Sequence, residues 1–190
     1  MANRLPSAMV FDLDGCVWDP EMYELWGSGG APFTQQSNGD LLDRSKQRVV
    51  LMGDVRNIMK EFKLDPKWKG TTISIASRCD EPSWAAECIK KFQVGEGLTL
   101  DHVFDSNTRE IYKGCKSGHL KTIARKTGFD LKDMMFFDNE YGNCQTVAKM
   151  GVTTVYTPNG VTREVFENGL SNFPTIDGTI LGPKKRAGKW

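Results

Sequence analysis

Two carboxylates stand one residue apart near the start of the chain. Asp12 and Asp14 follow the apolar run 8–11 and precede Gly15. An apolar run that ends at turn residues is typical of a buried strand in a parallel sheet, and ligands of such sheets bind beyond the carboxyl ends of the strands. Carboxylate oxygens and substrate phosphates are the ligands that Mg²⁺ prefers, so this stretch predicts metal-assisted phosphoryl transfer. Taken alone, the pattern equally fits a strand that runs into an Asx turn.

Polar residues also follow later elements of the predicted fold. Ser77 ends a β-rich run, Lys116 begins a helix after a predicted strand, and Asp138 ends another apolar run. Each has a structural explanation by itself: a turn serine, a solvated lysine and a helix cap. Together, at the same edge of a parallel sheet, they are difficult to assign to packing alone. The sequence therefore predicts that they meet the first pair of aspartates in one site.

The elements that must position these residues alternate along the chain. Strands are predicted at residues 8–11, 49–51, 71–76, 102–105, 134–137 and 152–156. Helices are predicted at residues 55–62, 82–92, 116–127, 143–150 and 161–168, the first of them capped by Asp54. This alternation indicates right-handed βαβ units and an α/β fold with a mostly parallel sheet. Residues 18–48 follow neither period and are expected to form a long irregular loop, a kind that is usually functional or disordered.

Composition excludes some classes of protein. The chain has 190 residues and a formal net charge of +1, which argues against a general nucleic-acid binder. Its apolar runs fall short of the roughly 20 residues that span a bilayer, and the first residues lack the apolar core of a signal peptide. Five cysteines without a Cys-x-x-Cys pair suit a reducing compartment. We therefore expect a cytoplasmic protein, with a monomer as the simplest assembly.

The chain length suits one domain, which we place at residues 1–176. Residues 177–190 are expected to form a flexible basic tail. The basic cluster 184–189 suggests nuclear entry as an alternative to a solvated terminus.

The four motifs resemble those of the haloacid dehalogenase superfamily: hydrophobic-Asp-x-Asp, hydrophobic-Ser/Thr, Lys and hydrophobic-Asp. The chain is most similar to the magnesium-dependent phosphatases of this superfamily, over most of residues 7–174. The similar stretches are residues 10–14, 17–18, 75–78, 115–119, 126–128, 135–140, 151–153 and 168–170. The resemblance implies a HAD-like, Rossmann-type α/β/α sandwich of three layers with a small β flap. The spans 14–77 and 77–116 are already used by the flap, two predicted strands and two predicted helices. They leave no room for an inserted cap domain, which usually needs at least about 50 residues.

The resemblance also implies a role for each motif residue. Asp12 is the expected nucleophile, which forms an aspartyl-phosphate, and Asp14 is the expected general acid and later base. Mg²⁺ is expected to bind Asp12, the backbone carbonyl of Asp14 and Asp138. Ser77 and Lys116 are expected to bind the phosphate group. The implied activity is that of a Mg²⁺-dependent acid phosphatase.

The sequence signals for three further substrate contacts are less specific. Leu13, Arg78 and Trp18 are candidates for contact with the phosphate or the substrate. For Arg78, a solvated surface position is an equal alternative. For Trp18, which belongs to a group with Tyr23 and Trp26, packing of the flap is the stronger alternative.

Asn139 departs from the subfamily, which typically has a second aspartate at this position. We expect weaker Mg²⁺ binding, with either Asp138 or Asn139 as the direct ligand. This departure leaves a catalytically weakened phosphate-binding or scaffold protein as an alternative. A glycosyltransferase that holds a metal through Asp-x-Asp is a further alternative, but it does not explain Ser77 and Lys116. The open cleft implies phosphotyrosine on a phosphoprotein, sugar phosphates or fructosamine phosphates as substrate classes.

Overall fold

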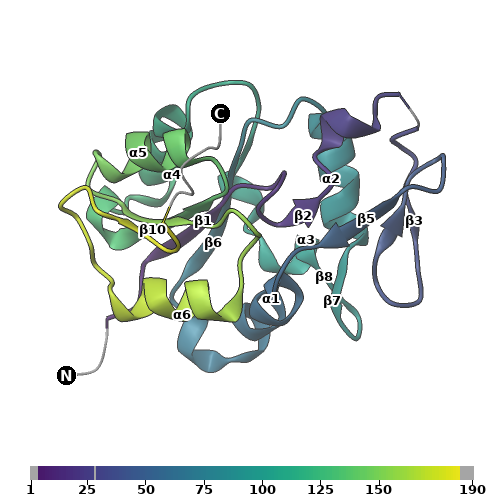
Figure 1. The fold of residues 1–190 in the computed structure, drawn as a ribbon. Helices are drawn as coiled ribbons and strands as arrows, with labels where there is room; N and C mark the ends of the chain where they lie inside the picture. The colour runs from purple at the N-terminus through teal and green to yellow at the C-terminus, as the bar shows by residue number, and fades with distance from the viewer. Residues whose placement is uncertain (1–3, 28, 185–190) are drawn as a thin grey trace.

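A parallel sheet forms the centre of the computed structural model, which describes residues 4–27 and 29–184. Within these residues the sheet has six strands in the order β12-β11-β10-β1-β6-β9, and each neighbouring pair is parallel. The strands are β1 (Ala8–Phe11), β6 (Thr72–Ser77), β9 (Arg109–Ile111), β10 (Met134–Asp138), β11 (Thr153–Tyr156) and β12 (Ile180–Leu181). Figure 1 shows β1 in the middle of this sheet, between β10 and β6.

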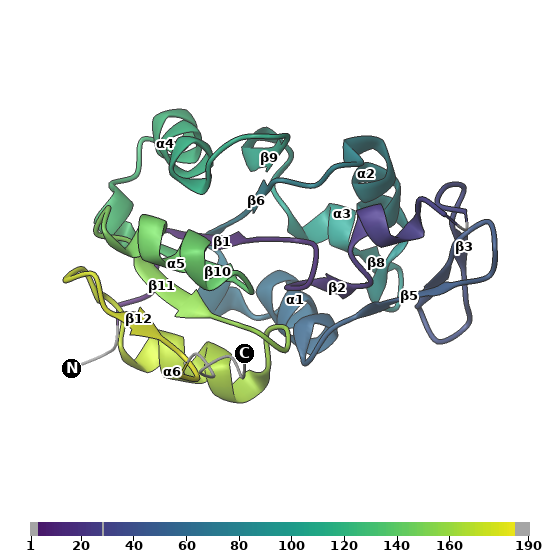
Figure 2. The same cartoon turned by 45° about the horizontal axis from the view of Figure 1, so that its top comes forward.

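Helices cover both faces of the sheet. Along β1, Ala8 and Val10 belong to a core shared with α4 (Lys116–Thr127) and α5 (Tyr141–Ala148). Met9 and Phe11 belong to the core on the other face, where α1 (Val55–Leu64) and α6 (Arg163–Ser171) pack. In Figure 1, α4 and α5 lie above the strands and α1 and α6 below them, and Figure 2 shows α4 and α6 on opposite sides of the sheet. The predicted three-layer α/β/α sandwich is confirmed.

The segment 18–48 is more ordered than its irregular sequence predicts. It contributes three strands to a small antiparallel sheet in the order β2-β5-β4-β3, and the residues that follow supply most of the fourth strand. The strands are β2 (Trp18–Asp19), β3 (Thr34–Gln35), β4 (Leu41–Leu42) and β5 (Arg48–Leu51), with a short 3₁₀ helix η1 (Met22–Leu25) after β2. This is the predicted β flap. The strand predicted at residues 49–51 belongs to it and not to the central sheet.

The flap packs beside α2 (Pro82–Lys91), at the end of the molecule away from β12 (Figure 1). The backbone N–H of Phe33 donates to Glu87 Oε1 on this helix at 2.8 Å. A short hairpin, β7 (Gln93–Gly95) and β8 (Leu98–Thr99), follows α2. Within the described residues no further domain is inserted between the strands that carry the motifs, in agreement with the expected absence of a cap.

The prediction of a strand at residues 102–105 is wrong. Helix α3 (Leu100–Val103) overlaps the first two of these residues, and a hydrogen bond from the Thr99 N–H to His102 Nδ1 at 3.1 Å closes its first turn. The sheet takes β9 as its edge strand instead. Asp54 precedes α1 as predicted, but its carboxylate caps a different helix, because it accepts from the N–H of Arg163 at 2.7 Å.

The predicted domain boundary at residue 176 is also corrected. β12 lies in the expected flexible tail and pairs with β11, Thr154 opposite Ile180 and Val155 opposite Leu181. The domain therefore extends through this strand. Residues 185–190, which hold most of the basic cluster, lie outside the described residues. Among the residues that the structure does describe, no helix combines the length and apolar character that crossing a bilayer requires.

Candidate active site

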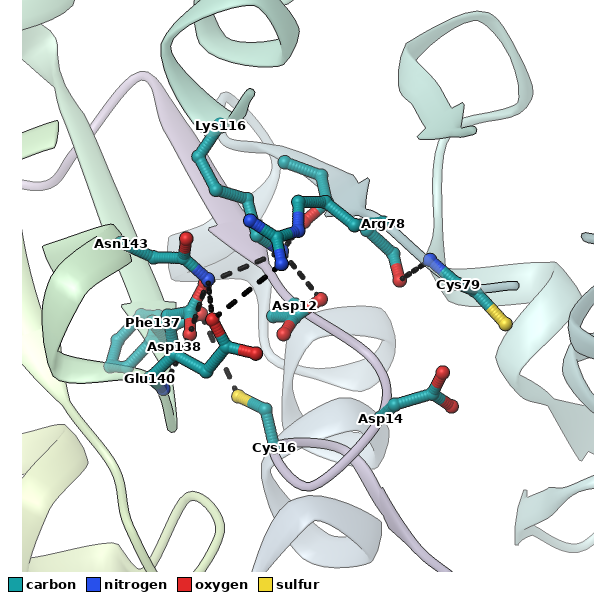
Figure 3. Close-up of polar contacts among 12 residues, drawn as sticks. Asp12, Asp14, Cys16, Arg78, Cys79, Lys116, Phe137, Asp138, Glu140 and Asn143 are labelled. Atoms are coloured by element: carbon teal, nitrogen blue, oxygen red, sulfur yellow. Dashed lines mark hydrogen bonds and ion pairs between the residues drawn. The ribbon is translucent and has the colours of Figure 1, made fainter. Parts of the chain in front are cut away.

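The carboxyl ends of β1, β6 and β10 lie side by side and bring the predicted motif residues together (Figure 3). Lys116, the first residue of α4, places its Nζ 2.6 Å from Asp12 Oδ1 and 3.3 Å from Asp138 Oδ2. The same ammonium donates to the backbone carbonyl of Ala76, beside Ser77, at 2.6 Å. The four motifs of the sequence therefore converge on one point.

This cluster of charges is removed from solvent. The exposed fractions of Lys116, Asp12 and Asp138 are 2%, 6% and 0%. Burial alone would lower the pKa of Lys116, but the carboxylates of Asp12 and Asp138 outweigh it and raise that pKa. Burial and the neighbouring charge of Asp12 raise the pKa of Asp138. The lysine thus remains a cation and holds two carboxylates that would otherwise repel each other.

Asp138 is held from several directions. Its Oδ1 accepts from the N–H of Glu140 at 2.7 Å, and its Oδ2 accepts from Asn143 Nδ2 at 3.1 Å. The Asn143 amide also donates to Glu140 Oε2 at 3.1 Å. Asn143 lies in the first turn of α5 and was not predicted from the sequence. The signal that could have found it is an amide-bearing residue at the start of a helix that directly follows the motif aspartate.

The Asp14 carboxylate points away from this cluster and toward Cys79 (Figure 3). Its Oδ1 accepts from Trp18 Nε1 at 2.7 Å, and the thiol of Cys79 is a second hydrogen-bond partner. Burial and the negative charge of Asp12 raise the pKa of Asp14, whereas the hydrogen bonds with Cys79, Trp18 and the backbone of Met22 lower it less. A carboxyl with a raised pKa is suited to proton donation.

Two residues that were predicted as substrate contacts have buried side chains. Trp18 has no exposed surface and stacks on Phe92, with ring centroids 5.9 Å apart, so its side chain contacts Asp14 and not the cleft. The side chain of Leu13 is likewise fully buried. Its carbonyl accepts from the N–H groups of the next turn, including that of Val17 at 2.7 Å. Leu13 therefore shapes the turn that carries the second aspartate.

A cleft of about 340 Å³ opens in front of the site, and its lining includes Asp12, Asp14, Ser77 and Arg78. Arg78 is half-exposed, and its Nη2 lies 3.9 Å from Glu140 Oε2, which keeps the guanidinium at the rim.

The lining also contains Tyr23 of the flap and two residues that the sequence did not indicate, Glu21 of the flap and Asp80. Burial, followed by the charges of Asp14 and Glu24, raises the pKa of Glu21 to about 7. These two residues were missed because nothing in the irregular flap segment shows which side chains face the cleft.

The donor set fits a hard cation such as Mg²⁺. Asp12 and Asp138 supply carboxylate oxygens, and Asn139 Oδ1 is buried without a hydrogen-bond partner among the described residues. Asp14 is available only through its backbone carbonyl, because its carboxylate points elsewhere. The described residues contain no cage of three or more His, Cys, Asp or Glu side chains. Mg²⁺ usually takes one or two carboxylates from the protein and completes its shell with water and substrate phosphate, and Asp12 and Asp138 can supply those carboxylates.

Comparison with known proteins places the chain in a family. The Acid Phosphatase family model matches residues 4–175. Magnesium-dependent phosphatase 1 of Homo sapiens is 31% identical over 172 residues, which cover 90% of this chain and 88% of the human protein. The chain belongs to the acid phosphatase family. The assignment explains why the motif residues converge, and it excludes the glycosyltransferase alternative.

Two more matches agree with an acid phosphatase of the haloacid dehalogenase type. A HAD-like hydrolase superfamily protein of Schizosaccharomyces pombe is 29% identical over 155 residues, 79% of this chain and 84% of that one. The N-terminal part of BF1531 from Bacteroides fragilis, a phosphatase domain complexed with Mg, superposes with a TM-score of 0.55 at 15% identity. That match covers 91% of this chain and 42% of the other chain, and it shows the fold alone. The resemblance that the motifs indicated is confirmed.

Proposed function

We propose that this acid phosphatase is a Mg²⁺-dependent phosphomonoester hydrolase that works through an aspartyl-phosphate on Asp12. The observation that carries the proposal is the different setting of the two aspartates. Asp12 lies 2.6 Å from the Lys116 ammonium, a cation beside the attacking carboxylate, whereas Asp14 lies apart from the lysine and has a raised pKa. A nucleophile must be ionised and a general acid must carry a proton, so the two environments divide these tasks.

The reaction then has two balanced steps. An Asp12 carboxylate oxygen attacks phosphorus while the bond from phosphorus to the leaving oxygen breaks, and Asp14 gives its proton to that oxygen. In the second step Asp14 takes a proton from water as the water oxygen attacks phosphorus, and the bond between phosphorus and Asp12 breaks. Inorganic phosphate leaves, and both aspartates return to their starting states.

Other residues of the site bind and stabilise the phosphoryl group. The Ser77 hydroxyl and the Lys116 ammonium lie at the same sheet edge as the nucleophile and are placed to bind phosphoryl oxygens. Mg²⁺, held by Asp12, Asp138 and the Asp14 carbonyl, would neutralise charge between the anionic nucleophile and the anionic substrate. Asn143 keeps the Asp138 carboxylate in place for that purpose.

For the substrate, we propose a phosphate ester with a bulky leaving group: phosphotyrosine, a sugar phosphate or a fructosamine phosphate. The support is the open cleft, whose lining includes Tyr23. Trp26 lies beside Tyr23, and the centroids of the two rings are 6.1 Å apart. Both rings are exposed, Trp26 by 58%, and offer an apolar surface to a leaving group. Comparing kcat/KM over phosphotyrosine peptides, sugar phosphates and fructosamine phosphates identifies the preferred class. Equal values for all three would remove the support for selectivity.

Hydrolysis of p-nitrophenyl phosphate with and without Mg²⁺ tests the activity, with Asp12→Asn as the matched variant. The amide has the shape of the carboxylate but is not a nucleophile. We expect turnover that requires Mg²⁺ and is lost in Asp12→Asn. An inactive wild-type protein that still binds a phosphate analogue would contradict the proposal and favour the phosphate-binding or scaffold alternative that Asn139 raises.

We further propose that the protein is cytoplasmic and monomeric. The support for a reducing compartment is that all five cysteines are free thiols. Imaging of a fluorescent fusion tests the location, and nuclear enrichment would favour the alternative based on the basic cluster. Light scattering tests the assembly, where a dimer mass would contradict the proposal.

A further inference from the structure

The flap fixes Trp18 to the turn that carries Asp14. Trp18 begins β2 and pairs with Leu51 of β5 in the antiparallel flap sheet. Its N–H donates to the carbonyl of Leu13 at 3.2 Å, and its carbonyl accepts from the N–H of Gly15 at 2.9 Å. The backbone on both sides of Asp14 is therefore bonded to the backbone of Trp18.

The Trp18 side chain is fixed as well. It has no exposed surface, and its ring stacks on Phe92 with an interplanar angle of 21°. From this position Nε1 reaches Asp14 Oδ1 at 2.7 Å. A hydrogen bond from a buried, immobile donor meets little competition from water, so it restrains the carboxyl group strongly.

This restraint fixes the orientation of the carboxyl group that handles the proton. An indole N–H can only donate, so the Asp14 oxygen that faces it remains an acceptor and the carboxyl is held in one orientation. We propose that Trp18 is a positioning residue for the proton transfers of Asp14. The inference rests on the proposed function: in the first step the proton leaves the Asp14 carboxyl for the leaving oxygen as the bond from that oxygen to phosphorus breaks.

The variant that tests the proposal is Trp18→Phe, which keeps an aromatic ring and removes the N–H. Trp68→Phe is the matched control. Trp68 is also buried, donates to Glu61 Oε1 at 3.3 Å and packs on Phe62 at 4.9 Å between ring centroids, away from the cleft. Both variants lose one buried indole, but only the first loses a contact to the general acid.

The readout is kcat/KM for two esters, measured with Mg²⁺. An alkyl phosphate needs a proton on its leaving oxygen, whereas an aryl phosphate of a strongly acidic phenol does not. We expect Trp18→Phe to lower kcat/KM about 10- to 100-fold for the alkyl ester and less than about 3-fold for the aryl ester, because general acid catalysis contributes about 10²–10⁴-fold. Trp68→Phe should change both values by the same factor.

Asp14→Asn supplies the reference for complete loss of proton donation. Because Trp18 is proposed to act through Asp14, adding Trp18→Phe to Asp14→Asn should leave the ratio of the two kcat/KM values unchanged. A folded Trp18→Phe protein that loses activity equally on both esters would overturn the proposal and make Trp18 a packing residue.

The test also covers a variant that does not fold and a wild-type protein without activity. If Trp18→Phe does not fold, a tryptophan analogue with sulfur in place of the N–H, inserted at position 18, keeps the ring volume and is judged by the same ratio. A wild-type protein that hydrolyses neither ester with Mg²⁺ would overturn the proposed function itself. That outcome is distinct from an active enzyme whose ester preference ignores Trp18.

Discussion

Replacing Lys116 by methionine should destabilise the protein far more than an ordinary loss of charge. The ammonium lies 2.6 Å from Asp12 and 3.3 Å from Asp138, and both carboxylates are almost fully buried. Methionine keeps much of the side-chain volume but leaves the two negative charges without their cation. Removing one partner of a buried ion pair costs about 3–5 kcal/mol, so we expect the free energy of unfolding to fall by that amount.

Urea unfolding near neutral pH in the presence of a chelator measures this loss. With a slope of about 2 kcal/mol per molar urea, the midpoint of Lys116→Met should fall by about 1.5–2.5 M. Lys67→Met is the matched control: Lys67 also contacts two carboxylates, Glu61 at 2.7 Å and Asp65 at 3.1 Å, but its side chain is 47% exposed. Exposed pairs contribute about 0–1 kcal/mol. Equal midpoint shifts in the two variants would refute the reasoning.

Three other predictions follow from single contacts. The pKa of Glu21 is raised to about 7. The protonated Glu21 side chain therefore contributes its full stabilisation below pH 4.5, the ordinary pKa of a glutamate, and this stabilisation is lost as the pH rises through 7. Glu21→Gln should therefore have a higher urea midpoint than wild type at about pH 8 and the same midpoint at about pH 4, and equal midpoints at both would contradict this. Asn143→Ala, which removes the amide that holds Asp138, should raise the Mg²⁺ concentration for half-maximal activity about 10-fold, and no change would show that the amide is dispensable. Gly15 and Gly128 have φ of +72° and +74°, but only at Gly15 would a methyl group meet a side-chain nitrogen, at 2.3 Å. Gly128→Ala should thus cost about 1 kcal/mol in urea unfolding and Gly15→Ala clearly more, and equal losses would be evidence against the close contact.

The residues that end apolar strands could be predicted from the sequence. Asp12, Ser77 and Asp138 each close a run of buried residues, and parallel strands place their carboxyl ends at one edge. Lys116 could be predicted because it begins a helix that ends at Gly128, a glycine with positive φ. The local pattern and the tertiary structure agree at these positions.

Other features depend on contacts that no local pattern contains. β9 consists of Arg109, Glu110 and Ile111, and such a short, charged edge strand shows no apolar period. β12 has two residues and exists because β11 offers it a free edge. The direction of the Trp18 side chain depends on Phe92 and on pairing within the flap. For this reason the sequence could place Trp18 near the site but could not show that its side chain contacts Asp14.

The most direct test of the account is to locate the phosphoryl group during turnover. The wild-type protein is quenched with acid while it hydrolyses a phosphate ester with Mg²⁺, and its peptides are analysed by mass spectrometry with and without hydroxylamine. We predict one phosphoryl group on the peptide that contains Asp12, removed by hydroxylamine as expected for an acyl phosphate. A hydroxylamine-resistant phosphoryl group on Ser77, or an actively turning over enzyme that carries no phosphoryl group, would contradict the account.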